Sequence, residues 1–350
     1  MKSKHIIIAP VYQQFMAGRI WMGLDTKIIE NQFKKLGWET NIISFDKLVD
    51  SLDDIPYNAV LFYSSVYNEN YLRYIQDTIL FITHQRPDIK IFPKFNQLYA
   101  LENKGFQEYM KKMLGIERVK GKYYGDIDEL VNDKLTFPFV LKENKGALSS
   151  GVHLIKSENE LIQIQKRLKK QSLKEKIAFQ VNKRNSFNKD QNLNPRENLL
   201  EINFTDYFQK RIPVIYQEFI PDLKCDYKVL QFGNKYYTFK RETRENDFRA
   251  SGSGKFSFEE APVEVLNFSK SIIEKLKTPF VSIDVGIDDS KNCYLFEFQG
   301  TAFGPIGLTQ SNFYSVWENN RWNKIEEKSI LEEEYANAID NFVKRTNEDN

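Results

Sequence analysis

Two apolar runs near the end of the chain each carry a carboxylate: Ser282-Ile283-Asp284-Val285-Gly286 and Tyr294-Leu295-Phe296-Glu297-Phe298-Gln299-Gly300. Both have the β-branched and aromatic content of buried strands. Because side chains alternate along a strand, Glu297 and Gln299 share one face. Acidic residues in such strands are often edge residues or salt-bridge partners. Oxygen ligands that converge from neighbouring strands also suit Mg²⁺ bound to nucleotide phosphates, so both interpretations stay open.

More strand-like segments precede these two runs. Strands are expected at residues 214–220, 227–232 and 235–240, and a helix at residues 263–276. Short strands separated by turns favour an antiparallel sheet with helices against it. Apolar side chains recur at helical spacing over residues 330–343, which predicts a terminal amphipathic helix with a packing role.

Strands and helices alternate in the first 95 residues. Apolar runs at residues 6–10, 40–45, 59–63 and 89–92 are separated by helical patterns at residues 25–36 and 71–84. This order predicts a small parallel α/β domain, which we expect to hold a substrate. A further helix is expected over residues 98–114.

A loop of small residues follows Lys142, which ends the predicted strand 137–142. The loop contains Gly146, Ser149, Ser150 and Gly151. Small side chains let backbone N–H groups approach phosphate oxygens, and a strand-anchored ammonium neutralises their charge. An ordinary hairpin has the same composition, so the loop is either a phosphate cradle or a simple turn.

Two further segments allow a functional and a structural interpretation. Residues 216–221 and 226–229 suggest two strands with Asp226 placed where a ribose could bind, although buried strand ends also carry such groups. Residues 240–255 mix cations with a Gly/Ser loop. That loop is either a solvated connection or a mobile segment whose Arg249, or a neighbouring cation, stabilises charge on a transferring phosphoryl group.

The overall composition is that of an ordinary globular protein with 350 residues and a formal charge of +2, which favours neither a nucleic-acid nor a membrane partner. Its two cysteines, Cys225 and Cys293, lie far apart in strand-like runs, and we expect neither a disulfide nor a thiolate metal site. A cytoplasmic location is expected. Residues 166–196 hold ten Lys or Arg and two acidic residues. This segment either clamps an anionic substrate or is a solvated, disordered surface.

Taken in order, these segments resemble the ATP-grasp superfamily, and in detail its carboxylate-amine ligases of the glutathione-synthetase and RimK (ribosomal-protein glutamate ligase) type. The resemblance covers residues 96–310 and implies an α/β (α+β) chain, an ATP-grasp fold with an N-terminal parallel α/β pre-ATP-grasp domain. Three parts are expected: the pre-ATP-grasp domain at residues 1–95, a small lobe with the phosphate loop and the basic insertion at 96–213, and a large lobe at 214–350.

The resemblance also implies roles for single residues. The phosphates of ATP would be held by Lys104, Lys142, Gly146, Ser149, Ser150 and Gly151. Adenine and ribose would be held by Gln217, Glu218, Phe219, Ile220 and Asp226. Mg²⁺ or Mn²⁺ would be bound by Asp284, Glu297 and Gln299, the last standing where the family usually has Asn. Catalytic cations would be Arg249, Lys228 and Arg241.

The implied reaction joins a carboxylate to an amine. ATP would phosphorylate the carboxylate, and the amine would attack the acyl phosphate, which releases ADP and phosphate. The expected partners are a small-molecule, peptide or glycan carboxylate and an amine, with no nucleic acid and no membrane, and a homodimer is compatible with the resemblance. A kinase-like phosphotransferase and a non-catalytic nucleotide-binding protein are the alternatives.

Overall fold

The computed structural model describes residues 4–11, 15–16, 23–66, 68–116, 118–146, 151–190, 209–244, 247, 249–250 and 254–348. The chain forms two compact units. Unit 1 comprises Met1–Val119, Lys145–Ser150 and Ile220–Asn350, and unit 2 comprises Lys120–Asn144 and Gly151–Phe219. The predicted boundaries at residues 95 and 213 stay predictions.

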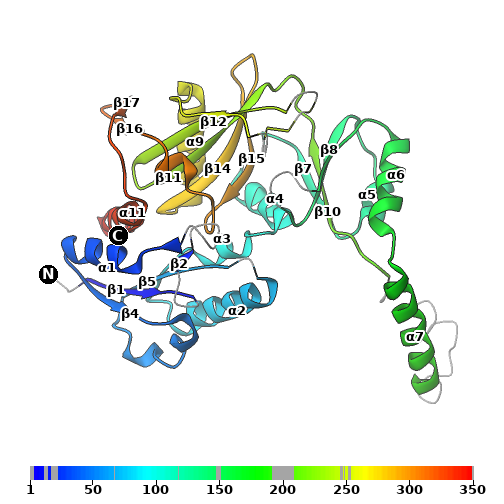
Figure 1. Cartoon of the computed structure of the whole chain (residues 1–350), viewed down its shortest axis with the longest axis horizontal. Coiled ribbons are helices and arrows are strands. Elements are labelled where there is room, and N and C mark those ends of the chain that lie inside the picture. The colour runs from blue at the N-terminus through cyan, green and yellow to red at the C-terminus, as the bar shows by residue number, and fades with distance from the viewer. Residues whose placement is uncertain are drawn as a thin grey trace. The chain divides into compact units, whose positions relative to one another are not determined.

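Unit 1 begins with a parallel sheet in the strand order β4-β1-β5-β6 (Figure 1). Its elements are β1 (Lys4–Ala9), α1 (Thr26–Lys35), β4 (Trp38–Ile42), β5 (Val60–Tyr63), α2 (Glu69–Gln85) and β6 (Lys90–Phe92). Smaller elements accompany them: β2 (Phe15–Met16), β3 (Gly23–Leu24), η2 (Phe45–Lys47) and η3 (Leu52–Asp54). All four residues of β5 are buried, as in a strand covered on both faces. The predicted parallel α/β domain is confirmed.

The single helix predicted over residues 98–114 is wrong, because the chain breaks there into α3 (Phe95–Tyr99) and α4 (Lys104–Met113). Glu102 lies between them in the left-handed region, with a φ of 52°. Asn103 then caps α4, since its side chain accepts a hydrogen bond from the backbone N–H of Phe106. The break places the N-terminus of α4 at Lys104.

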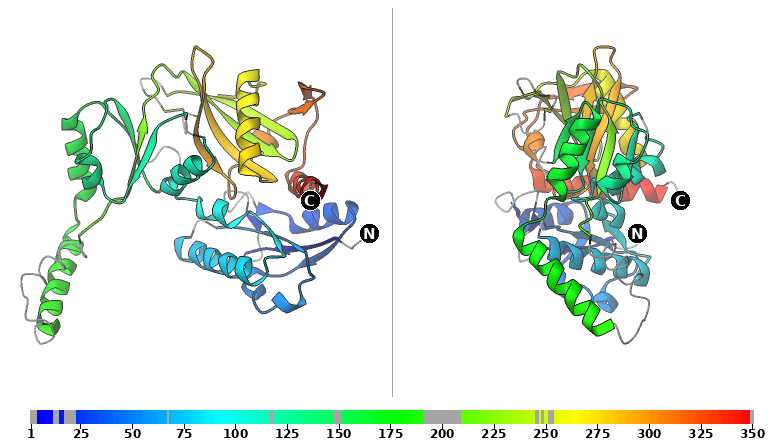
Figure 2. Two further views of the ribbon diagram at one scale, coloured as in Figure 1. Left: turned by 180° about the vertical axis from the view of Figure 1, so that it is seen from behind. Right: turned by 90° about the vertical axis from the view of Figure 1, so that its right-hand side faces the viewer.

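The second sheet of unit 1 is antiparallel, in the order β15-β14-β11-β12-β16-β17, with β13 paired to β12. Its strands are β11 (Cys225–Phe232), β12 (Lys235–Glu242), β13 (Phe256–Ser257), β14 (Phe280–Ile287), β15 (Cys293–Gln299), β16 (Tyr314–Glu318) and β17 (Arg321–Ile325). The accompanying helices are α9 (Val263–Leu276), α10 (Ile306–Thr309) and α11 (Leu331–Glu348). Figure 2 shows α9 lying across one face of this sheet. The predicted antiparallel sheet and its helices are confirmed except for the strand predicted at residues 214–220, because β10 (Val214–Glu218) belongs to the separate sheet of unit 2. Both cysteines are free.

Unit 2 contains a four-stranded antiparallel sheet in the order β7-β10-β8-β9. Its elements are β7 (Gly121–Tyr124), α5 (Ile127–Val131), β8 (Phe139–Glu143), β9 (Val152–Ile155), α6 (Glu158–Lys169), α7 (Leu173–Asp190) and β10 (Val214–Glu218). Figure 1 shows α7 leading away from the sheet of this unit. Ile177 and Val181 are about half exposed on α7. The described side chains of α7 are therefore mostly exposed to solvent.

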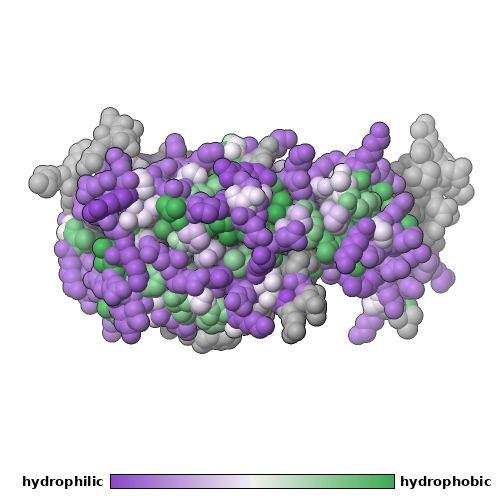
Figure 3. Space-filling view, turned by 90° about the horizontal axis from the view of Figure 1, so that it is seen from above, coloured by the Kyte–Doolittle hydropathy of each residue, from purple (hydrophilic) through white to green (hydrophobic). Residues whose placement is uncertain are grey.

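The outer surface agrees with the ordinary globular composition. Over the face in Figure 3, the described side chains are mostly hydrophilic, with small groups of hydrophobic residues among them. Among the described residues, no helix has both the length and the apolar character that crossing a membrane requires.

Buried aromatic rings join the two sheets of unit 1. The ring centroid of Phe62 on β5 lies 5.9 Å from that of Phe280 on β14 and 5.6 Å from that of Tyr335 on α11. Phe280 in turn lies 4.8 Å from Tyr335 and 6.3 Å from Phe232. Edge-to-face and tilted contacts of this kind add to the free energy gained by burial. The cluster fixes the parallel sheet against the large sheet.

Replacing Phe280 by Ala is expected to destabilise the protein by about 3–5 kcal/mol, because it leaves a cavity among rings that cannot all collapse into it. Urea unfolding followed by circular dichroism measures this. The matched control is Tyr57→Ala, at a side chain that is 76% exposed, and its unfolding midpoint should not move. Equal midpoints for the two variants would contradict the role of the cluster.

Candidate active site

Lys228, Asp284 and Glu297 form a row across three neighbouring strands of the large sheet. Lys228 on β11 is paired in register with Asp284 on β14, and Asp284 is paired with Glu297 on β15. Residues paired in this way point to the same face of a sheet. The opposite face carries apolar residues such as Val229 and Ile283, which pack in the cluster with α9. The row therefore lies on the face away from α9.

Arg241 lies beside this row and links two buried carboxylates. Its Nε and Nη2 atoms donate to the two oxygens of Asp226 at 2.6 and 2.8 Å. Its Nη2 also lies 2.9 Å from Oδ2 of Asp284, and Nζ of Lys228 donates to Oδ1 of Asp284 at 2.9 Å. All four side chains are at most 15% exposed. We call Asp226, Lys228, Arg241 and Asp284 the ion-pair cluster.

The charges of the ion-pair cluster balance, with two cations against two carboxylates. Burial alone raises the pKa of Asp284, but Arg241 and Lys228 outweigh burial and hold that pKa well below its ordinary value. Burial likewise lowers the pKa of Arg241, and the two carboxylates more than reverse this. Asp284 is thus kept ionised although it is buried.

Glu297 and Gln299 extend the row on β15. Nε2 of Gln299 donates to Oε1 of Glu297 at 3.2 Å. The amide oxygen of Gln299 therefore points away from Glu297. With Asp284, these side chains offer two carboxylates and an amide oxygen, which is a donor set suited to Mg²⁺. Among the described residues, no three His, Cys, Asp or Glu side chains are grouped for a metal ion. A metal ion here would therefore need the amide of Gln299 or oxygens from a ligand.

Helix α4 holds β15 from one side through residues that the sequence did not single out. Nζ of Lys111, which is paired with Glu108 at 2.7 Å, donates to the carbonyl of Phe296 at 3.1 Å. The backbone N–H of Phe298 donates to Oε1 of Gln107 at 3.4 Å. These bonds fix the backbone on both sides of Glu297. No sequence pattern indicates these bonds, because the partners lie more than 180 residues apart.

Lys104 and Gly146, both expected to bind phosphate, lie in direct contact. Nζ of Lys104 donates a short hydrogen bond to the carbonyl of Gly146. The N–H of Gly146 donates to Oε2 of Glu102 at 3.2 Å. The N-terminus of α4 and the start of the small-residue loop are thus held together. Ser149 and Ser150 lie outside the described residues.

Unit 2 carries a second group of predicted residues. Lys142 on β8 is paired with Ile215 on β10, and Val140 with Gln217, so Lys142 and Gln217 share a face. The other face of these strands packs Phe139 and Leu141 into the core of the unit. Gln217 is 3% exposed, and its Nε2 atom has no hydrogen-bond partner. A buried donor of this kind costs free energy unless a ligand satisfies it.

The remaining predicted residues of this region are fixed by the backbone. Gly151 has a φ of 70°, and a Cβ there would lie 2.9 Å from the Cβ of Glu143, so only glycine fits. The N–H of Glu218 donates to the carbonyl of Lys120 at 2.9 Å. Phe219 and Ile220 follow β10 and are half-buried.

Arg249 is placed differently from the other two predicted catalytic cations. Its Nε and Nη2 atoms donate to Asp247, with distances of 2.6–3.0 Å, and this pairing raises the pKa of Arg249. Lys228 and Arg241, in contrast, meet on Asp284. The structure thus brings two of the three cations together and leaves Arg249 paired within its own loop.

Comparisons with known proteins bear on the fold. No protein-family description matches the sequence, and no curated protein matches it. Among solved structures, D-cycloserine synthetase DcsG matches with a TM-score of 0.54 and 10% identity over 95% of this chain and 98% of that one. The ADP complex of purK, an N5-carboxyaminoimidazole ribonucleotide synthetase, matches with a TM-score of 0.51 and 11% identity over 89% and 74%. A D-alanine–D-alanine ligase from Bacillus anthracis matches with 15% identity over 99% of both chains, at a TM-score of 0.48.

The chain has an ATP-grasp fold, as the order of its sequence motifs predicted. The structures that share it carry the names of synthetases. At such low identity the similarity concerns the fold, and the chemistry has to be argued from the site itself.

Replacing Arg241 by Met is expected to destabilise the protein by roughly 3–5 kcal/mol near neutral pH, because two buried carboxylates would then share one ammonium. In the wild type, the lowered pKa of Asp284 gives stability that is present above the unfolded pKa and lost only as the pH falls below it. In the variant, burial would raise the carboxylate pKa values, so stability should fall as the pH rises.

Urea unfolding at about pH 5 and about pH 8 tests this, and the loss of stability relative to wild type should be larger at the higher pH. Lys224→Met is the control, since its ion pair with Asp289 is exposed on both sides and should contribute no measurable stability. A loss that does not change with pH would contradict the electrostatic role of Arg241.

Proposed function

We propose that this protein is an ATP- and Mg²⁺-dependent ligase that joins a carboxylate to an amine through an acyl phosphate. The observation that carries the proposal is the row of Lys228, Asp284 and Glu297 on the face of the large sheet that α9 leaves uncovered. Cations and carboxylates side by side on an ATP-grasp sheet suit the transfer of a phosphoryl group, where both the metal and the phosphates need partners.

Each unit has its own group of residues that suit contacts with a nucleotide. In unit 2, Lys142 would meet the phosphates, and the unpartnered amide of Gln217 would donate to the nucleotide. The backbone from Glu218 to Ile220 would meet adenine. In unit 1, Lys104, the backbone of Gly146, Ser149 and Ser150 would meet the phosphates, and so would Gly151 in unit 2. A ligand that satisfies the Gln217 donor would recover the free energy that its burial costs.

Mg²⁺, or Mn²⁺, would be held by Asp284, Glu297 and Gln299, whose donor atoms are all oxygens. The metal ion would neutralise charge on the phosphates during transfer. Asp284 would be shared between the metal ion and the two cations, because its two oxygens already contact Lys228 and Arg241. Lys228 would then turn from Asp284 toward the phosphate oxygens, while Arg241 stays anchored by Asp226.

Asp226 would act mainly by positioning Arg241. Both of its oxygens are occupied by the guanidinium, and the residue is 8% exposed. Contact with a ribose, as the resemblance implies, would require part of this pairing to open. Arg249 would reach the acyl phosphate only after its loop exchanges the contact with Asp247.

A non-catalytic nucleotide-binding protein is the second candidate, and one observation favours it. Lys228 and Arg241 already neutralise Asp284, which weakens the attraction of this carboxylate for a metal ion. A kinase-like phosphotransferase would share the site but would phosphorylate a hydroxyl or phosphate group. Hydroxylamine separates this case, because it traps an acyl phosphate as a hydroxamate and leaves phosphate esters unchanged.

Glu297→Ala is expected to lower metal-dependent ADP release by roughly a hundredfold or more, because it removes an oxygen ligand of the proposed metal ion. ADP release is measured with pooled carboxylates, with pooled amines and with both, and the wild type should need both pools. Glu318→Ala is the control on the same sheet, since Glu318 is exposed on β16. Turnover by Glu297→Ala at the wild-type rate would refute the metal assignment, and nucleotide binding without turnover in any pool would favour the second candidate.

Lys142→Ala is expected to raise the Kd of an ATP analogue about tenfold, because it removes one charge-assisted hydrogen bond to a phosphate. Isothermal titration calorimetry measures the affinity. Lys156→Ala removes an exposed lysine of the same unit and should leave the Kd unchanged. Equal affinities of both variants would remove Lys142 from the nucleotide site.

A further inference from the structure

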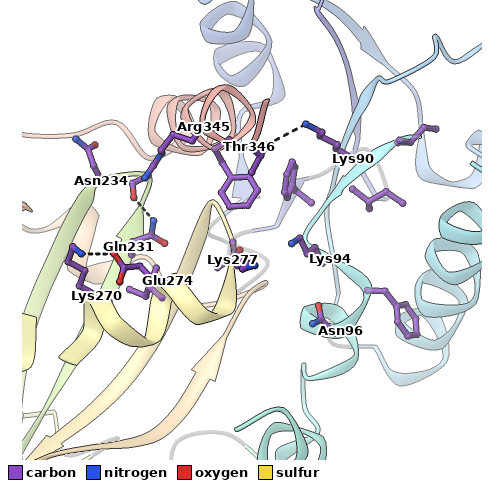
Figure 4. Close-up of a pocket in the computed structure, with 18 of the residues that line it drawn as sticks. Lys90, Lys94, Asn96, Gln231, Asn234, Lys270, Glu274, Lys277, Arg345 and Thr346 are labelled. Carbon is purple, nitrogen blue, oxygen red and sulfur yellow. Dashed lines mark hydrogen bonds and ion pairs between the residues drawn. The ribbon is translucent and has the colours of Figure 1, made fainter. Parts of the chain in front are cut away.

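Unit 1 contains a cavity of about 1130 Å³. None of the proposed nucleotide, metal or catalytic residues lines it. Its walls come from the edge strand β6 and the start of α3, from the turn between β11 and β12, and from the ends of α9 and α11 (Figure 4). Cavities of this size accommodate a small organic ligand.

The cavity is strongly positive. Five cationic side chains line it, and Glu274 is the single carboxylate among its described lining residues. Glu274 is already paired with Lys270. Nζ of Lys90 donates to uncharged oxygens of Thr346 and Asn347 on α11. The lining therefore carries an excess of four positive charges, which favours an anion.

Lys94 and Lys277 are two of the five cations that line the cavity. Figure 4 shows the side chain of Lys94, the N-cap residue of α3, pointing toward Lys277, the C-cap residue of α9. Burial, and then the charge of Lys277, lowers the pKa of Lys94. Among the described residues neither ammonium has an ion-pair partner, and Lys94 lies 5.7 Å from the ring centroid of Phe342. Two like charges held together in a partly apolar cavity repel, and an anion between them would relieve the repulsion.

Lys277 also occupies an unfavourable backbone position. It ends α9 with a φ of 48° and a ψ of 57°, in the left-handed region where Gly or Asn is usual. A lysine there costs conformational free energy. This position directs a cation into the cavity, which a glycine would not.

The rest of the lining is largely apolar and aromatic. Tyr236, Ile273, Trp317 and Phe342 are among these apolar and aromatic residues. We propose that this cavity is a binding site for a small organic anion that has a carboxylate, sulfonate or phosphate group for Lys94 and Lys277 and an apolar or planar body for these side chains. The cations suit a carboxylate, a sulfonate or a phosphate group equally. Ligands of all three kinds would be amphipathic anions.

The cavity lies apart from the candidate active site. Gln231 lines the cavity, and Lys228, the nearest member of the ion-pair cluster on the same strand, lies three residues earlier. At about 3.3 Å per residue, roughly 10 Å separate the two along the strand, and their side chains point to opposite faces of the sheet. Loss of anion binding and loss of ATP turnover can therefore be measured separately.

The test uses anilinonaphthalene sulfonate, a fluorescent amphipathic anion, with the full-length protein in the presence of saturating Mg-ADP. The wild type should bind this probe, and uncharged N-phenylnaphthylamine should bind more weakly. Lys277→Gly should raise the Kd of the probe about fivefold because one of the two cations is lost, while the protein itself becomes more stable because glycine suits the left-handed position. A purely structural role for Lys277 would change the stability alone.

Lys94→Glu should weaken probe binding further, and Lys112→Glu, at an exposed lysine on α4 outside the cavity, should leave it unchanged. Thermal melting and circular dichroism check that each variant is folded. If Lys94→Glu does not fold, the probe affinity of Lys277→Gly alone tests the proposed anion site. Probe affinities that are equal in the wild type and in Lys277→Gly would overturn the proposal, and so would displacement of the probe by Mg-ATP.

Discussion

The guanidinium of Arg241 is the group on which the candidate site depends. It lies between Asp226 on β11 and Asp284 on β14. It can contact both carboxylates only while β11, β12 and β14 keep their register. A slip by one residue would turn every side chain of a strand to the other face. The ion pairs on one face and the apolar packing against α9 on the other therefore specify the same register. The aromatic cluster around Phe280 strengthens this arrangement, because Phe280 begins the strand that carries Asp284.

The balanced charges of the ion-pair cluster also limit what the site can do. Buried charges are tolerated only when they are paired, and here each carboxylate has a cation at 2.6–2.9 Å. Metal binding at Asp284 therefore has to compete with Lys228, and the phosphates of a nucleotide supply the negative charge to which Lys228 can turn. A site of this kind favours the metal ion and the nucleotide arriving together. It differs from a site of free carboxylates, which would bind a divalent cation by itself.

Helices and strands could be predicted from the sequence wherever apolar residues recur at regular spacing over a long segment. The helix at residues 263–276 was predicted with the bounds that α9 has, because its apolar residues recur at helical spacing. The helix predicted at residues 98–114 failed at Glu102, whose positive φ no periodicity reveals. The sequence left a salt bridge and a metal site open for Asp284. Its ion pairs with Lys228 and Arg241 depend on strand register, which a single sequence does not specify.

The cavity of unit 1 could not be predicted from the sequence, because it depends on long-range contacts. Lys94 and Lys277 stand 183 residues apart, and neither belongs to a motif. The wall near Lys277 is held by the chain itself: the hydroxyl of Thr278 donates to the carbonyl of Phe280 at 2.9 Å, and the N–H of Gly233 donates to the carbonyl of Pro279 at 2.9 Å. Because these bonds involve no residue of the cation pair, the wall persists without a ligand. A preformed wall spends little of the binding free energy on ordering the protein, so the affinity of an anion there reflects mainly its contacts with the two ammonium groups.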